Sequence, residues 1–216
     1  MNYQLAFHRF SNAVVDADEA INSEFLELLD VIRGISDESL IETLSDQRER
    51  WKIHQLEKKK AVITKKVRPK SLSVAINELL KVRLVASGWK AESPIFRDPV
   101  YSSGSRWYLD FAKEEISVEV AFNHAEATAH NLIKPVLASE LNHVDKAIQT
   151  RLGVVVTCME SLREAGNFDG AVGTFESFQT YLKPYQNILI APLIIIGLEA
   201  PASFKIDKKS REIIQF

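Results

Sequence analysis

Residues 107–122, WYLDFAKEEISVEVAF, hold the pattern that decides the fold and the candidate chemistry of this chain. They predict two short strands joined by a reversal over residues 113–116, with Asp110 followed nine positions later by Glu119. Along the second strand, apolar residues alternate with polar or small ones, so period-two geometry sends Glu119 to the face opposite the apolar set. The reversal then brings Asp110 and Glu119 to one face of neighbouring strands.

Two carboxylates held close together in a cleft share a proton or a cation, because like charges cannot both stay ionised there without compensation. Mg²⁺ bound by two carboxylates, with its other positions open to water and phosphate, is a common solution. Asp110 and Glu119 are therefore candidate metal ligands. The same spacing also fits a pair of exposed carboxylates at a sheet margin, and this alternative stays open.

The composition is that of an ordinary globular chain of one domain, or of one domain with an appendage. The chain has 216 residues, of which 46% are hydrophobic and 26% charged, and it is long enough to bury a full core. A single cysteine, Cys158, forms no internal disulfide and favours a reducing, cytoplasmic setting. No apolar run approaches a membrane span, and the first ten residues lack a signal-peptide pattern.

Charge is distributed unevenly along the first third of the chain. Residues 1–47 hold ten acidic residues and two basic ones, whereas residues 48–70 hold ten Lys or Arg against two Glu. So dense a basic segment, which includes Lys65 and Lys66, is a candidate contact for the phosphate backbone of a nucleic acid. A solvated helix face is the alternative interpretation.

Apolar periodicity predicts the other elements. Helices are expected over residues 11–35, from 36 or 37 to about 56, over 71–87 and over 125–143, the last one kinked at Pro135. Buried strands are expected at 152–158 and 193–198, a strand fragment and loop over 89–106, helix or loop over 160–183, and an edge strand in 204–216. This order predicts an α/β or α+β sandwich, a mixed sheet flanked by helices.

Three blocks of the chain, SVAINELLKVRLVASGWKAES, LDFAKEEISVEVAFNH and APLIIIGLEAP, resemble the BglII-type branch of the type II restriction endonucleases. The resemblance covers about residues 72–200. The central block is the most specific, because Asp, eight residues, then Glu-Val-polar-Phe is the spacing of that branch. The resemblance implies a PD-(D/E)xK nuclease core with N-terminal helices. It also implies Mg²⁺-dependent, sequence-specific hydrolysis of double-stranded DNA by a homodimer, leaving 5′-phosphates.

The resemblance assigns roles to individual residues. Asp110 and Glu119 would be the metal-binding catalytic carboxylates, and Glu92 would be a third catalytic acid. Asn123, His124 and Lys134 would read base edges in the major groove, where Asn binds adenine and Lys donates to guanine.

Ala121 departs from the pattern, because the family has Gln, Glu or Lys at this position, near the attacking water. A methyl group neither hydrogen-bonds that water nor shares charge with the phosphate. Three explanations stay open. Another polar side chain takes the place, with Lys90, Lys113 or His124 as candidates, or the chain is a disabled variant, or the protein binds DNA without cutting it well.

Two regions follow from these assignments. Residues 1–70 are expected to form an N-terminal helical region for dimerisation or DNA-backbone contact, and residues 71–216 an endonuclease-like catalytic core. A catalytically impaired DNA-binding protein on the same scaffold is the main alternative function. A metal-dependent hydrolase of a non-nucleic substrate is a further one.

Overall fold

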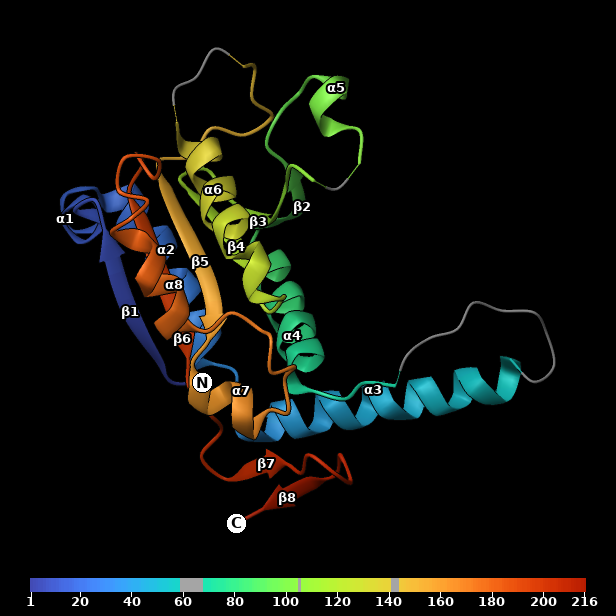
Figure 1. Cartoon of the computed structure of the whole chain (residues 1–216). Helices are drawn as coiled ribbons and strands as arrows, with labels where there is room; N and C mark the ends of the chain where they lie inside the picture. Colours follow the sequence, from blue (N-terminus) through green and yellow to red (C-terminus); the bar gives the residue numbers. More distant parts are fainter. Residues whose placement is uncertain (59–67, 105, 141–143) are drawn as a thin grey trace.

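The centre of the molecule is a mixed sheet. In a computed structural model that describes residues 1–58, 68–104, 106–140 and 144–216, six strands form this sheet in the order β1-β6-β5-β4-β3-β2 (Figure 1). The strands are β1 (Tyr3–His8), β2 (Lys90–Pro94), β3 (Tyr108–Ala112), β4 (Ile116–Val120), β5 (Leu152–Cys158) and β6 (Leu193–Leu198). The central strands β4, β5 and β6 are parallel, whereas β1, β3 and β2 run antiparallel to their neighbours.

Helices cover both faces of the sheet, which confirms the predicted architecture. One face carries α1 (Ser11–Ala17), α2 (Glu19–Arg33) and α4 (Leu72–Ala86), and the other carries α6 (Thr128–Ser139) and α8 (Phe175–Leu182). The remaining helical segments are α3 (Asp37–Lys58), α5 (Pro99–Ser102), η1 (Ala125–Ala127) and α7 (Glu160–Ala165). α3 packs along α4, and its C-terminal end extends beyond the rest of the described chain (Figure 1). No helix within the described ranges is long and apolar enough to cross a membrane.

The two predicted core strands are confirmed at their predicted bounds. Every residue of β5 and β6 is buried, as expected for β-branched runs covered by helices on both faces. The amphipathic stripe predicted for the N-terminal helix is also present in α2, where Ile21, Phe25 and Ile32 are buried at helical spacing.

The helix predicted over residues 11–35 is instead two helices, α1 and α2, separated at Asp18. The backbone of Asp18 is extended, and its carboxylate accepts hydrogen bonds from the N–H groups of Ala20 at 3.1 Å and Ile21 at 3.2 Å. Asp ends one helix and begins the next because it satisfies the first free N–H groups of α2. The helix predicted over 125–143 is likewise shorter, since α6 ends at Ser139 with Pro135 inside it. Residues 141–143 lie outside the described ranges.

The two ends of the chain also differ from expectation. The sequence pattern predicts no strand before residue 11, yet β1 pairs along its whole length with β6 and forms one edge of the sheet. The tail predicted as an edge strand folds back on itself, as β7 (Phe204–Ile206) pairs only with β8 (Ile213–Gln215). Most residues of β1 are only partly buried or exposed, so the segment lacks the continuous apolar run that marks β5 and β6.

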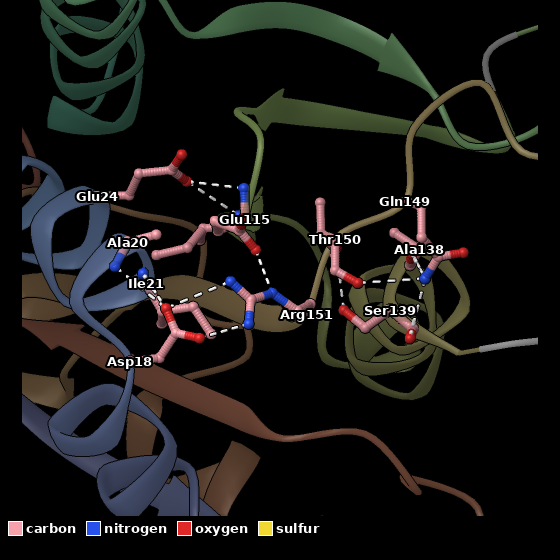
Figure 2. A network of polar contacts seen from close by, with 11 residues as sticks. Asp18, Ala20, Ile21, Glu24, Glu115, Ala138, Ser139, Gln149, Thr150 and Arg151 are labelled. Carbon is pink, nitrogen blue, oxygen red and sulfur yellow. Dashed lines mark hydrogen bonds and ion pairs between the residues drawn. The ribbon is translucent and has the colours of Figure 1, made fainter.

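The reversal between β3 and β4 is fastened to the rest of the fold by a polar network (Figure 2). Arg151, which precedes β5, donates hydrogen bonds to the carboxylates of Asp18 and Glu115. The Glu24 carboxylate, from α2, accepts from the backbone N–H groups of Glu115 at 3.0 Å and Ile116 at 3.1 Å. The hairpin that carries Asp110 and Glu119 is therefore held against α2 and β5 at its turn.

Helix α6 lies close to the sheet because position 153 of β5 is a glycine. A Cβ atom added at Gly153 would lie 2.7 Å from Pro135 Cβ and 2.9 Å from Leu193 Cδ1, closer than packed carbon atoms approach. The missing side chain thus sets the distance between α6 and β5.

We expect Gly153→Ala to lower the free energy of unfolding by about 1–3 kcal/mol, because α6 or Leu193 must move to admit the methyl group. Gly170→Ala is the matched control, since a Cβ added at Gly170 meets no atom within 4 Å. Urea denaturation of both variants measures the difference. Equal midpoints would contradict the account of a tight contact at Gly153.

Candidate active site

The two candidate carboxylates occupy facing positions on β3 and β4. Phe111 pairs with Val118 and Ala112 with Ser117, and the same register extended by one residue sets Asp110 opposite Glu119. Asp110 Oδ2 accepts a hydrogen bond from the Val120 N–H at 2.7 Å. This bond fixes the Asp110 carboxylate at the end of β4.

Glu119 is buried between the sheet and α6. It is only 4% exposed, and its Oε1 accepts a hydrogen bond from Lys134 Nζ at 2.5 Å. Its other oxygen, Oε2, is buried without a hydrogen-bond partner in the described part of the chain. An unpartnered carboxylate oxygen in a dry site is costly, and a cation is the natural ligand for it.

The electrostatic environment couples the two carboxyl groups. Burial, and to a smaller extent the nearby Asp110 charge, raise the pKa of Glu119 to about 8, although Lys134 opposes both effects. Burial also raises the pKa of Asp110, against the lowering effects of the Val120 N–H and the Lys134 charge. Both groups therefore bind protons more tightly than free carboxylates unless positive charge is added to the site.

The donor chemistry of this site fits a hard divalent cation. Glu119 Oε2 and the Asp110 carboxylate are oxygen donors, which Mg²⁺ and Ca²⁺ prefer. Within the described ranges, no cluster of three or more His, Cys, Asp or Glu side chains has the geometry of a metal site. Two protein carboxylates leave the other positions to water and phosphate, as Mg²⁺ sites in phosphoryl-transfer enzymes do.

Glu92, the third predicted acid, lies on β2, the neighbour of β3 on the side away from β4, and faces Asp110 in the register of these two strands. Its neighbours Ala91 and Ser93 pair with Phe111 and Leu109. Glu92 itself has φ of 52°, a left-handed conformation that is strained in a non-glycine residue.

The Glu92 carboxylate does not ligate with the other two acids in this conformation. It accepts a hydrogen bond from Lys81 at 2.6 Å and is largely exposed. Together with Asp110, Asn77 and Val120, these two residues line a cleft of about 130 Å³ between α4 and the sheet. Glu92 is thus near Asp110 but paired with another charge.

The cation beside Glu119 is none of the three residues that were candidates to replace a polar side chain at position 121. Lys113, one of the candidates to replace a polar group at 121, donates instead to Glu27 at 2.8 Å. Lys90 and His124 are exposed. Lys134, from α6, is the residue that contacts Glu119.

The position of Lys134 does not favour the predicted contact with a base edge. Lys134 is 7% exposed and its ammonium is paired with Glu119, so it does not project towards a DNA groove. The signal that points to this role is helical spacing. Asn131, Lys134, Pro135 and Ala138 follow the i, i+3, i+4, i+7 pattern of a core-facing stripe, and all four are buried.

The loop after β4 presents the predicted DNA-reading residues. Asn123 and His124 are both exposed, and the loop is tied to residues 171–173 by a bond from the Gly173 N–H to the Asn123 carbonyl at 3.2 Å. The Asn123 side chain accepts a hydrogen bond from Asn131 Nδ2 at 2.7 Å. Asn131 was not predicted, and it orients the Asn123 amide.

The basic segment is only partly described, because Lys65 and Lys66 lie outside the described residues. Several of its described members are compensated within the chain: Arg48 and Arg68 contact Glu212, Arg50 contacts Glu78, and Lys52 contacts Glu49. Arg48 is also buried. Arg50 thus joins α3 to α4, and Arg48 joins α3 to the C-terminal hairpin, whereas the Lys52–Glu49 pair lies within α3.

Comparisons with known proteins give a consistent result. A family model described as restriction endonuclease BglII/BglIII matches residues 3–198, including most of the N-terminal region that carries no recognisable motif. The fold is similar to a crystal structure of restriction endonuclease BglII complexed with a DNA 16-mer, with TM-score 0.63, 16% identity, and coverage of 100% of this chain and 88% of that chain. It is also similar to a crystal structure of free BglII, with TM-score 0.54, 14% identity, and coverage of 100% of this chain and 91% of that chain. No curated protein sequence matches the chain.

We expect Lys134→Met to lower the free energy of unfolding by about 3 kcal/mol near pH 9, because it leaves the Glu119 charge buried and uncompensated. The loss shrinks towards pH 6, since the raised pKa of Glu119 lets the carboxyl take up a proton there. Stability is therefore lost as the pH rises through the folded-state pKa.

Glu119→Gln combined with Lys134→Met is the matched control, since it removes both charges and should recover most of the stability. Guanidinium denaturation at the two pH values measures all three proteins. A pH-independent loss, or a double variant no better than the single one, would contradict a charged pair at this site.

Proposed function

Because the chain belongs to the BglII/BglIII restriction endonuclease family, as its three sequence blocks predict, we propose that it cuts double-stranded DNA at a specific sequence with Mg²⁺. The products would carry 5′-phosphates. The protein would act in the cytoplasm as a homodimer, because two-fold dimers match the symmetry of palindromic sites.

The observation that carries this proposal is the pair Asp110 and Glu119. The two acids face each other in the register of β3 and β4, and Glu119 Oε2 is buried without a hydrogen bond among the described residues. A shared divalent cation would satisfy both carboxylates. Bound there, Mg²⁺ would activate a water molecule and stabilise negative charge on the scissile phosphate.

The three acidic residues of the proposed site are held in different ways. Asp110 is held by the Val120 N–H, so its carboxylate is oriented before DNA arrives. Glu119 is immobilised between β4 and α6, which excludes water from one side of the site. Glu92 would join as a third acid, and for this it must leave Lys81, a weak exposed pair.

DNA recognition would use the exposed loop after β4. Asn123 and His124 are the candidates for base contacts. The Asn123 amide both accepts from and donates to Asn131, at 2.7 Å and 3.4 Å, so this pair would have to open for a bidentate contact with adenine. The similar BglII structure was determined in complex with DNA, which supports duplex DNA as the substrate. Lys65, Lys66 and other lysines of the basic segment would contact the phosphate backbone.

We also propose the division of labour between residues 1–70, for dimerisation and backbone contact, and residues 71–216, for catalysis. The division would be one of function, since β1 pairs with β6 and α2 packs in the main core. Residues 1–70 share the main core with residues 71–216, whereas the buried residues of the two smaller apolar clusters all come from residues 71–216.

Ala121 motivates a second candidate, a DNA-binding protein that binds its site without cutting it. The two functions differ in turnover. A protein that shifts one specific duplex in a gel but leaves it intact with Mg²⁺ or Mn²⁺ would favour the second.

We expect the protein to convert plasmid DNA into discrete fragments with Mg²⁺, and Asp110→Asn or Glu119→Gln to reduce the rate at least about 10²-fold. Glu164→Gln, at an exposed position of α7 and outside residues 1–70, is the matched control and should cut normally. Gel electrophoresis of timed digests gives the rates. Wild-type protein that neither binds nor cuts duplex DNA at low salt would end the proposal.

Once the fragments reveal the site, we expect Asn123→Ala to weaken binding to that site by about 1–3 kcal/mol, because one base edge loses its contact. Binding to unrelated duplex should change little. Asn187→Ala, at an exposed turn position before β6, is the control. Gel shifts with Ca²⁺ in place of Mg²⁺ measure both affinities, and an equal loss on both duplexes would assign Asn123 to the backbone.

A further inference from the structure

Lys134 is a buried lysine whose presence the packing of α6 does not explain. The other members of its buried stripe hold Asn123, pack on Gly153 or join an apolar cluster, and an apolar residue at position 134 would suit the same stripe. Burying an ion pair is usually no better for stability than packing two apolar side chains. The positive charge at position 134 is therefore best explained by a role in the catalysed reaction.

Hydrolysis of a phosphodiester at this site requires positive charge beside the phosphate. A water oxygen forms a bond to phosphorus, and the bond from phosphorus to the 3′ oxygen breaks with its electron pair left on that oxygen. One water proton is released to solvent, and the 3′ oxygen takes up a proton from solvent. Negative charge grows on the phosphate oxygens beside two carboxylates, so a fixed cation stabilises the transition state.

Strand position 121 does not supply this cation. Ala121 lies two residues beyond Glu119, and strand alternation therefore puts it on the same face. Its methyl group is fully buried in an apolar cluster with Leu132 and Val136. It carries neither a charge nor a hydrogen-bond donor.

We propose that Lys134 is the cationic catalytic residue of this chain, contacting the scissile phosphate from α6 in place of a side chain at position 121. A lysine ammonium has three donors on a flexible stem, so one N–H can stay on Glu119 Oε1 while another donates to a phosphate oxygen. The charge of Lys134 also lowers the pKa of Asp110. This inference rests on the proposed nuclease function.

A second lysine offers a matched comparison. Lys113 donates to Glu27 at 2.8 Å and to the Ser87 carbonyl at 3.0 Å, and it is partly buried. This pair joins the hairpin to α2 and α4 without contacting Asp110 or Glu119. Lys113→Gln thus removes a structural ion pair of the same type outside the site.

The test measures two quantities for the wild type, Lys134→Gln and Lys113→Gln. These are the single-turnover rate of plasmid cleavage with Mg²⁺, and the affinity for Mg²⁺ by titration calorimetry without DNA. Glutamine at 134 keeps a hydrogen bond to Glu119 but has no charge. We expect its cleavage rate to fall about 10²-fold while Mg²⁺ binds at least as tightly as in the wild type, because a competing cation has gone. Lys113→Gln should match the wild type in both quantities.

A role limited to holding Glu119 predicts the opposite pattern, since Lys134→Gln would then lose Mg²⁺ affinity and cleavage together. That result, or an unchanged cleavage rate, overturns the inference while the nuclease function stands. If Lys134→Gln does not fold, Lys134→Arg decides, because it keeps the charge and should retain at least about a tenth of the rate; a near-complete loss of the rate in folded Lys134→Arg overturns the inference. A wild type that binds no Mg²⁺ and cuts no DNA removes the proposed function, and this inference with it.

Discussion

A carboxylate buried between a sheet and a helix remains ionised only beside positive charge, and this constraint governs the arrangement around Glu119. The residue lies on a strand with apolar neighbours, it is almost fully buried, and its pKa is raised to about 8. One oxygen meets the Lys134 ammonium, while the other has no hydrogen bond among the described residues. The fold thus supplies half of the compensation that the charge requires, and a bound cation would supply the remainder.

The rest of the structure keeps that arrangement in register. The turn between β3 and β4 is held by Arg151 and Glu24, which fixes the offset that sets Asp110 opposite Glu119. Gly153 lets α6 approach the sheet closely enough for Lys134 to reach its partner. Segments far apart in the sequence thus fix the position of the Glu119 carboxylate relative to Asp110 and Lys134.

Much of the fold was predictable because its core strands are apolar over their whole length and its helices carry clear stripes. The register of Asp110 and Glu119 was also predictable, since strand alternation and a short reversal are local properties. Lys134 was assigned to DNA because the family resemblance places base-reading residues after the carboxylate motif. Its actual partner lies fifteen residues earlier, on a strand, and only the docking of α6 brings the two together. The strand β1 was missed for a related reason, because its identity depends on a partner near the other end of the chain.

The pairing of β1 with β6 has a consequence for synthesis of the protein. β6 lies between β1 and β5 in the sheet, so β1 has no neighbour in this sheet until residues 193–198 have been synthesised. Contacts of such long sequence separation form late. The backbone N–H and C=O groups of β1 therefore stay unpaired in the nascent chain until β6 has been made, which leaves an exposed strand edge during that interval.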